Sequence, residues 1–180
     1  MKHKSVFAAT ALIALALGLA GCAGGDPTGH MDGSRVELYD SVRGIAADAS
    51  LIAVGEVTEQ EVVQEDIPYT LSTFAIEREF SPAVLGRDVP AGAPKIEGSE
   101  VVVRQMGAAG TELPYPILEP GQRYLLFLSP SMLEGEKATQ LYITGGSAGI
   151  YSIEGNAFVH GPFTEGDTLP GKLTANDLQN

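Results

Sequence analysis

Apolar residues occur along most of the chain in short alternating or continuous runs, and glycine and proline separate one run from the next. Strict alternation is typical of a strand buried on one face, and a short continuous apolar run is typical of a strand buried on both. The run at 124–128 (YLLFL) is apolar on both faces, and we expect it to be a central strand. The whole pattern predicts strands at residues 51–65, 70–80, 101–103, 124–128, 141–144, 150–153 and 158–159.

The segment before these strands has a different period. Apolar residues recur at helical spacing between residues 36 and 49, which predicts a short amphipathic helix capped by Asp40 or Ser41, although Gly44 weakens it. In the first strand the apolar alternation changes face at Gly55, as a bulge or bend requires. Many short strands, turn residues between them and a single helix predict a mainly β fold, either a small barrel or a sandwich.

The first 21 residues have the pattern of a secretory signal. Lys2 and Lys4 make the start basic, residues 6–19 form an uncharged apolar run, and small residues precede Cys22. The apolar run has 14 residues. A transmembrane helix needs about 20, so the pattern indicates a cleaved signal and not a permanent span. We expect cleavage between Gly21 and Cys22.

The sequence Leu-Ala-Gly-Cys at 19–22 resembles the lipobox of bacterial lipoproteins. In that family the cysteine sulfur receives a diacylglycerol, and the signal is removed just before the cysteine. The resemblance implies a lipid on Cys22, with acyl chains such as palmitate, and two acyl chains are enough for stable anchoring. Residues 22–34 are rich in glycine and aspartate and predict a flexible tether. We therefore expect a single domain at 35–180, held at the extracytoplasmic face of the cell membrane.

Charge and cysteine content exclude several classes of function. The formal net charge is −12, and removal of the basic signal takes it to about −14. An acidic chain argues against nucleic-acid binding, which relies on basic patches. Cys22 is the only cysteine, so its lipidation excludes an internal disulfide, a zinc–thiolate site and thiol catalysis. We predict no cofactor, and the domain must fold on its hydrophobic core alone.

Five segments between residues 40 and 153 follow an order found in OB-fold domains. They read DSVRGIAADASLIAVGEV, TFAIEREF, EVVVRQMG, PGQRYLLFL and GIYSI. This order resembles the netrin-like branch of OB-fold domains, and it is also similar to uncharacterised lipoproteins of high-GC bacteria. The resemblance implies a small OB-fold-like (netrin-like) β-barrel with a short N-terminal helix. It rests on core and turn residues, so it implies a fold and not a particular activity.

Tissue inhibitors of metalloproteases are the best-known relatives of that fold, and they use a free N-terminal cysteine to chelate the protease metal. In this chain the N-terminal Cys22 would be acylated, and the disulfides of those inhibitors are absent. We therefore do not expect their mechanism. Inhibition of an envelope protease by an inserted loop remains an alternative function.

Residues 145–149 (GGSAG) match the G-x-S-x-G motif of α/β-hydrolases, with Ser147 as the nucleophile. That motif needs a strand before it and a helix after it, whereas 150–153 is a predicted strand. The acid of the triad should also precede the histidine, but His160 precedes Asp167. We expect a tight loop between two strands, and a serine hydrolase is the less favoured alternative.

Metal-ligating patterns are weak in this chain. The mature part has two histidines, His30 and His160, without a second ligand at metal-binding spacing. An acidic run follows the first strand, and a solvated edge explains it, since charges on an exposed edge discourage aggregation. Weak calcium binding is the alternative, and we predict no metal site. The acidic run consists of Glu59, Glu61, Glu65 and Asp66.

Aromatic residues in loops are the best binding candidates. Residues 113–120 (LPYPILEP) place Tyr115, Pro116 and Ile117 in a proline-stiffened loop, which loses little entropy on binding. Tyr69 lies in the loop before the second predicted strand, and tyrosine is favoured at contact surfaces. The alternative is that these loops pack over an end of the barrel. We expect a non-catalytic module that binds an extracytoplasmic protein or ligand.

Overall fold

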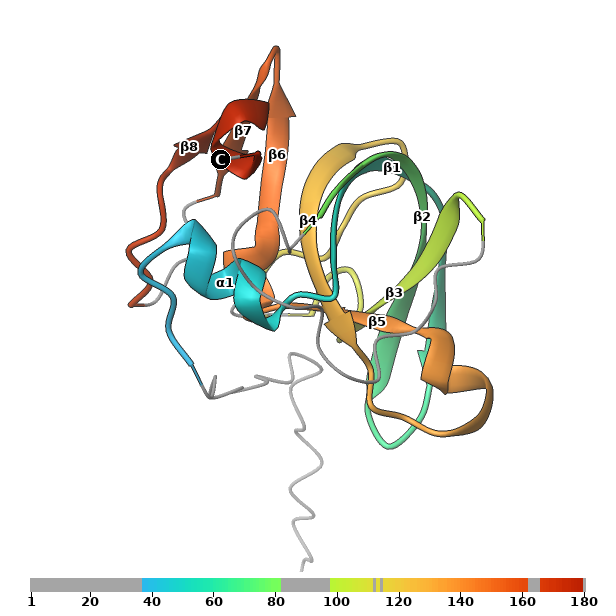
Figure 1. Cartoon of the computed structure of the whole chain (residues 1–180). Coiled ribbons are helices and arrows are strands. Elements are labelled where there is room, and N and C mark those ends of the chain that lie inside the picture. The colour runs from blue at the N-terminus through green and yellow to red at the C-terminus, as the bar shows by residue number, and fades with distance from the viewer. Residues whose placement is uncertain (1–36, 82–97, 112, 114, 162–165, 180) are drawn as a thin grey trace, which may run out of the picture.

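The computed structural model describes residues 37–81, 98–111, 113, 115–161 and 166–179 (Figure 1). The predicted signal peptide, Cys22 and the tether lie outside the described residues. The described elements are α1 (Val42–Asp48), β1 (Leu51–Gln64), β2 (Pro68–Phe80), β3 (Glu100–Met106), β4 (Arg123–Pro130), η2 (Gly135–Thr139), β5 (Leu141–Ile143), η3 (Gly146–Gly149), β6 (Ile150–Glu154), β7 (Ala157–His160), β8 (Lys172–Leu173) and η4 (Ala175–Leu178), where η marks a 3-10 helix.

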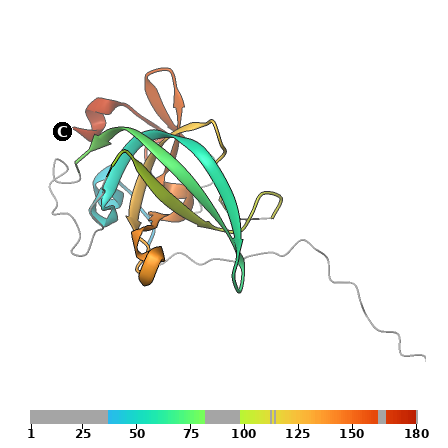
Figure 2. The ribbon, with the colours of Figure 1, turned by 90° about the vertical axis from the view of Figure 1, so that its right-hand side faces the viewer.

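Five strands close into a barrel because β1 pairs along both of its edges. One edge pairs with β2 along almost the whole strand, and residues 51–56 also pair with β4 on the other edge. The order β1-β2-β3-β5-β4 then returns to β1, and β3–β5 is the parallel pair among the described strands. Figure 2 shows β1 and β2 curving across the barrel. The predicted mainly β fold, a small OB-fold-like barrel with a short N-terminal helix, is confirmed.

Beyond the barrel, β4 carries the sheet into a second layer. β6 pairs with β4, and β7 and β8 extend the sheet from there. In Figure 1, α1 and these three strands lie on one side of the barrel. Since β4 pairs with β1, β5 and β6, the prediction of a central strand at 124–128 is confirmed.

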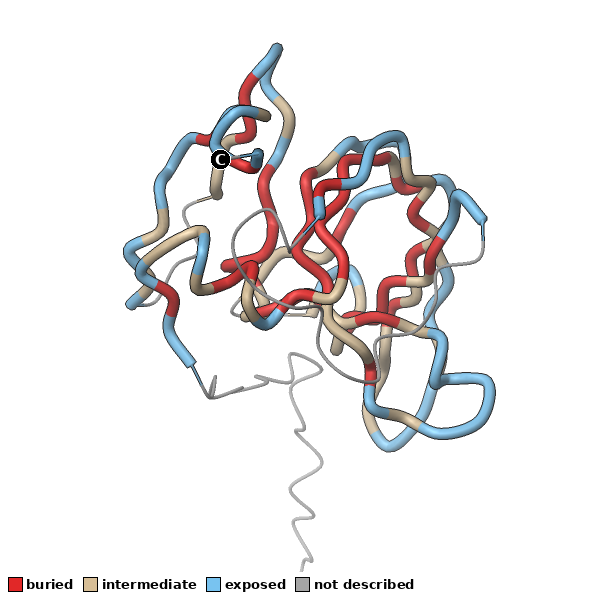
Figure 3. The backbone as a smooth tube through the Cα atoms, in the orientation of Figure 1, coloured by how far each residue is buried: buried red, intermediate tan, exposed pale blue. Residues whose placement is uncertain are grey.

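Two hydrophobic cores result, and β4 contributes to both because its side chains alternate between faces. Leu126 and Leu128 belong to the barrel core, whereas Leu125 and Phe127 pack with α1 and the second layer. Figure 3 shows this continuous burial along the middle of the molecule. The barrel core consists of Leu51, Ala53, Val57, Phe74, Val101, Val103, Leu118, Leu126, Leu128, Leu141, Ile143 and Ile150. The second core consists of Tyr39, Ile45, Ala46, Ala49, Ile52, Val54, Phe80, Leu125, Phe127, Ala148, Tyr151, Phe158, Leu173 and Leu178.

The pairing of β1 with β2 is irregular at Gly55, as the sequence predicts. Val54 pairs with Arg78 and Gly55 pairs with Ile76, so Glu77 is the extra residue. This bulge therefore lies on β2, which changes there from the barrel core to the second core. A second register shift, between Val57 and Glu59, leaves Thr58 as the extra residue on β1, so β1 changes face three residues after the glycine.

The helix occupies Val42–Asp48, within the predicted segment 36–49 and directly after one of the two predicted caps. The backbone N–H of Tyr39 donates a hydrogen bond of 2.7 Å to a carboxylate oxygen of Asp167, and Ser41 is the cap that the helix uses. Nowhere in the described part of the chain is there a helix long and apolar enough to cross a membrane.

Gly55→Val is expected to destabilise the fold by about 2–3 kcal/mol, since overpacking costs energy of this order. A Cβ at this position would come within 2.1 Å of the carbonyl oxygen of Ala75 and 2.9 Å of the Phe74 ring. Gly171→Ala is the control, because nothing lies within 4 Å of its added Cβ. Urea unfolding measures both variants. Equal stability of the Gly55 variant and the wild type would contradict the close approach of β1 and β2.

Candidate functional site

Arg104 lies on the outer face of the barrel and directly follows the three valines of β3. Val101 and Val103 belong to the barrel core, and side chains alternate along a strand, so Arg104 faces outward. It is nevertheless only 2% exposed. Burial of a charge is costly unless the charge is paired. The partners of Arg104 therefore identify the groups that shape this face.

Separate segments supply these partners. Nη2 of Arg104 lies 2.8 Å from Oε2 of Glu65, just after β1, and Nη1 donates a hydrogen bond of 3.2 Å to Oε1 of Gln140. The guanidinium carbon lies 3.7 Å from the centroid of the Tyr69 ring, a cation–π contact. Nζ of Lys137, in η2, lies 2.7 Å from Oε1 of Glu65. We call Glu65, Tyr69, Arg104, Lys137 and Gln140 the Arg104 cluster.

The ion pair at the centre of the cluster shifts the pKa values of both partners. Hydrogen bonds from Lys137 and then Arg104 hold the pKa of the Glu65 carboxyl below its ordinary value. Burial acts to lower the pKa of Arg104, but Glu65, with a smaller contribution from Tyr142, outweighs burial and the pKa is raised. Both groups are therefore charged at neutral pH.

Three half-buried tyrosines border the same face. Tyr142 on β5 pairs with Arg104, Tyr69 on β2 pairs with Met106, and the Tyr115 hydroxyl donates a hydrogen bond of 3.2 Å to the Met106 carbonyl. Burial, followed by Tyr69 and Tyr142, raises the pKa of Tyr115. The structure thus brings together the two tyrosines that the sequence singled out. We call Tyr69, Arg104, Tyr115 and Tyr142 the Tyr–Arg face.

Tyr69 lies within β2, which corrects its predicted place in the loop before that strand. The β1–β2 hairpin stays paired as far as Gln64 and Pro68, so only residues 65–67 form the turn. Proline donates no hydrogen bond, but the first position of a strand tolerates it. The strand therefore begins two residues before the predicted start at residue 70.

The loop between β3 and β4 packs over an end of the barrel. This is the alternative that the sequence left open beside an exposed binding loop. The Leu118 N–H donates a hydrogen bond of 2.9 Å to Oε1 of Gln105, and Nε2 of Gln105 donates one of 2.9 Å to the Pro116 carbonyl. Nε2 of Gln60 donates one of 2.7 Å to the Leu118 carbonyl. Leu118 itself is 2% exposed in the barrel core. Two glutamines, neither singled out from the sequence, therefore hold the loop in place.

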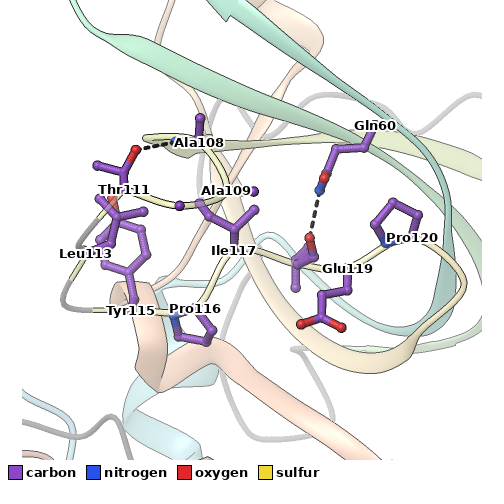
Figure 4. Close-up of a pocket in the computed structure, with 12 residues that line it drawn as sticks. Gln60, Ala108, Ala109, Thr111, Leu113, Tyr115, Pro116, Ile117, Glu119 and Pro120 are labelled. Carbon is purple, nitrogen blue, oxygen red and sulfur yellow. Dashed lines mark hydrogen bonds between the residues drawn. The ribbon is translucent and has the colours of Figure 1, made fainter. Parts of the chain in front are cut away.

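Two pockets flank this loop. The larger, of about 410 Å³, has Pro116 and Ile117 in its wall, as Figure 4 shows. The smaller, of about 140 Å³, lies among β3, β5 and η3 and is bordered by Arg104 and Tyr142. Tyr115 borders both pockets. Of the predicted binding residues, Tyr115 is therefore the one that links the loop to the Tyr–Arg face.

Ser147 lies in η3, a single turn between β5 and β6, and is 8% exposed. A nucleophile elbow requires a helix after the serine, whereas a strand follows here, as predicted. His160 is close by in the fold, and its Nδ1 and Nε2 lie 2.8 Å and 3.2 Å from the carbonyl oxygens of Gly161 and Ala148. The local structure is that of a turn joining two strands.

The acidic run at the end of β1 divides into two groups. Glu59, Glu61 and Asp66 are exposed, as predicted for a solvated edge. Glu65 instead pairs with Arg104 and Lys137, and no local pattern could indicate partners so distant in sequence. Within the described residues, no group of three or more His, Cys, Asp or Glu side chains could hold a metal ion.

Comparisons with other proteins give no family or relative from which a function of the site could be inferred, so its geometry is the basis for a proposal. No protein-family model matches the chain, and no curated protein matches it. The resemblances to netrin-like domains and to bacterial lipoproteins stay predictions. The Tyr–Arg face and the Arg104 cluster are therefore the basis of the functional proposal.

Glu65→Gln is expected to lower stability at about pH 7, because it leaves Arg104 buried without its carboxylate. The pKa of Glu65 is lowered from 4.5 in the fold. The ionised Glu65 carboxyl therefore stabilises the fold at pH values above 4.5, and this stabilisation is lost as the pH falls through the lowered pKa of the folded state. The difference from the wild type, measured by urea unfolding, should shrink at low pH. Glu61→Gln is the control and should follow the wild type throughout. A difference that stays constant down to about pH 3 would contradict this assignment.

Proposed function

We propose that the chain is a membrane-anchored envelope lipoprotein whose OB-fold-like barrel is a non-catalytic binding module for an extracytoplasmic protein. The anchor is the lipid that the lipobox resemblance implies at Cys22. The binding surface is the Tyr–Arg face on the outside of β2, β3 and β5. The tether would hold this surface near the membrane and leave it accessible to a partner.

The observation that carries the proposal is the convergence of three tyrosines on one buried arginine. Tyrosine and arginine are enriched at the energetic centres of protein interfaces. Contacts within the fold also restrain these side chains before binding, since Tyr69 stacks on Arg104 and the Tyr115 hydroxyl is hydrogen-bonded. Restrained side chains lose less conformational entropy when a partner binds. The face therefore has the composition and the order of a binding surface.

The position of this face in the fold supports the same function. OB-fold domains bind ligands on the face of their second and third strands and on the adjacent loops. Here Tyr69 lies on β2, Arg104 lies on β3, and the β1–β2 turn and η2 supply Glu65 and Lys137. By contrast, the outer sides of β1 and β4 pack against α1 and the second layer. Among the described elements, the face of β2, β3 and β5 is thus left for a partner.

Cys22→Ser tests the anchor. In growing cells the wild-type chain should incorporate labelled palmitate and sediment with membranes, because two acyl chains give stable anchoring. The Cys22 variant should incorporate none. Ala23→Ser, one residue further along, is the matched control and should keep the label. Undiminished labelling of the Cys22 variant would contradict lipidation at this residue.

Photo-crosslinking tests the binding surface. A photoreactive phenylalanine analogue at position 69 or 142 should give a discrete protein adduct in intact cells. The same analogue at Glu154, an exposed residue at the end of β6, is the control and should not give that adduct. Formation of the adduct from all three positions alike would contradict a specific face.

Tyr115→Ala in the crosslinker-bearing chain should reduce the adduct at least tenfold, since truncation of an interface hot spot costs about 2 kcal/mol or more. Leu38→Ala removes an apolar side chain that is 57% exposed and lies outside the Tyr–Arg face, and it should leave the yield unchanged. Both variants should still unfold in a cooperative thermal transition, and the Tyr115 variant should melt slightly lower because it loses the hydrogen bond to the Met106 carbonyl. An undiminished adduct in a folded Tyr115 variant would remove this loop from the surface.

A further inference from the structure

The smaller pocket on the Tyr–Arg face combines apolar walls with a charged group. It is lined by Met106 and Ile143 together with the tyrosines Tyr115 and Tyr142, and Arg104 forms part of the wall. Its volume is about 140 Å³. A buried cavity of roughly 150 Å³ holds a benzene molecule, so this pocket has room for about one side chain.

Arg104 keeps a buried hydrogen-bond donor without an acceptor in the fold. Nη1 and Nη2 contact Gln140 and Glu65, whereas Nε is buried and has no hydrogen-bond partner. A buried donor without an acceptor destabilises the fold by about as much as a lost hydrogen bond. A hydrogen-bond acceptor on a ligand would remove this penalty, and the free energy recovered would favour binding of the ligand.

The charges beside the pocket also favour an anion. Arg104 and Lys137 both pair with Glu65. Within the described residues, neither cation has an ion pair with another carboxylate. Two positive groups therefore share one negative group, in a chain whose formal net charge is −12. A second carboxylate at this point would complete the pairing.

We propose that this pocket binds a carboxylate carried on an apolar body of about one side chain. The carboxylate contacts Arg104, and the apolar body lies between Met106, Ile143 and the two tyrosine rings. The inference rests on the proposed function and deepens it by naming the chemistry that the Tyr–Arg face takes from its partner. A phosphate fits less well, because it needs several converging donors, and Nη1 and Nη2 already contact Gln140 and Glu65.

Two sources could supply this group: the C-terminal residue of a partner protein, or a free organic acid. The carboxylate and the apolar body are common to both. A C-terminal leucine carries both features within one residue, and 4-methylpentanoate is its analogue without the amino group. These two forms serve as probes of the same site.

The test uses the full chain in detergent with ¹³C-labelled tyrosine, which gives six reporters. Titration with 4-methylpentanoate should shift the signals of Tyr115 and Tyr142 in a saturable way, with a Kd on the order of millimolar for so small a ligand. Tyr39 and Tyr151, which lie in the second core, should not shift. Neutral 4-methylpentanamide and acetate, which lack the charge and the apolar body respectively, should each bind at least tenfold more weakly.

Lys137→Ala should raise the Kd for 4-methylpentanoate roughly threefold, as expected for loss of one exposed charge. Lys172→Ala, on β8, removes the same charge at a distance from the pocket and is the control. No shift at Tyr115 and Tyr142, or equal shifts with the amide or with acetate, would overturn the proposal. Equal affinity of the wild type and the Lys137 variant would also overturn it.

A tetrapeptide ending in leucine separates the two sources. Binding at least tenfold tighter than that of 4-methylpentanoate, and abolished by C-terminal amidation, supports a partner C-terminus. Binding of 4-methylpentanoate without binding of the peptide supports a free acid. Crosslinking in cells that depends on Tyr115, without carboxylate binding, would overturn this inference and leave the binding module in place. Carboxylate binding without any such crosslinking would instead overturn the protein-binding function.

Discussion

The guanidinium group of Arg104 lies buried on the outside of the barrel, where it needs negative charge and hydrogen-bond acceptors that its own strand does not supply. Glu65 comes from the β1–β2 turn and Gln140 from the segment after η2, while Tyr69 covers the group from β2. Lys137 pairs with the Glu65 carboxylate as well, so an ion pair links the β1–β2 turn to η2. The arrangement of the Tyr–Arg face therefore depends on one buried charge and its partners.

The pairing of the buried Arg104 with the solvent-exposed Glu65 is weak support for stability, since removing the arginine charge from water costs about as much as the attraction of its partner returns. Stability comes instead from the two cores, which the chain must build without a disulfide because Cys22 is its only cysteine. β4 is apolar on both faces and belongs to both cores, so it joins the barrel to the second layer. That layer covers the outer sides of β1 and β4. Among the described elements, the face that carries Arg104 is therefore the one that we propose for a partner.

Strand positions were predictable from the sequence because burial on one or both faces leaves a period that can be read locally. The irregularity at Gly55 was located correctly, but its extra residue lies on β2, and the bulge of β1 follows three residues later at Thr58. A register shift belongs to a pair of strands, and one sequence segment shows only half of it. β8 was not predicted because its two residues are too few to form a pattern. The helix begins after Ser41, a cap that residue type indicates locally, whereas the hydrogen bond of the preceding Tyr39 to the distant Asp167 leaves no local pattern.

The candidate site was only partly predictable. Tyr69 and Tyr115 were identified from residue type, but their convergence depends on the pairing of β2 with β3, which no local pattern records. Arg104 was missed, although a charged residue directly after three valines was the available signal. Gln105 was missed because an amide that binds a loop backbone looks like any polar residue in sequence. Long-range partners are therefore the part of the site that sequence could not provide.

The central claim is that the fold keeps Arg104 for recognition and not for stability. The free energy of unfolding of the double variant Glu65→Leu/Arg104→Met, compared with the wild type by urea unfolding, tests this claim most directly. Apolar residues of similar size should replace the ion pair with little change in the free energy of unfolding, or with a gain. A loss of stability as large as that of the Glu65→Gln variant would contradict the account and make the ion pair a structural requirement of the barrel.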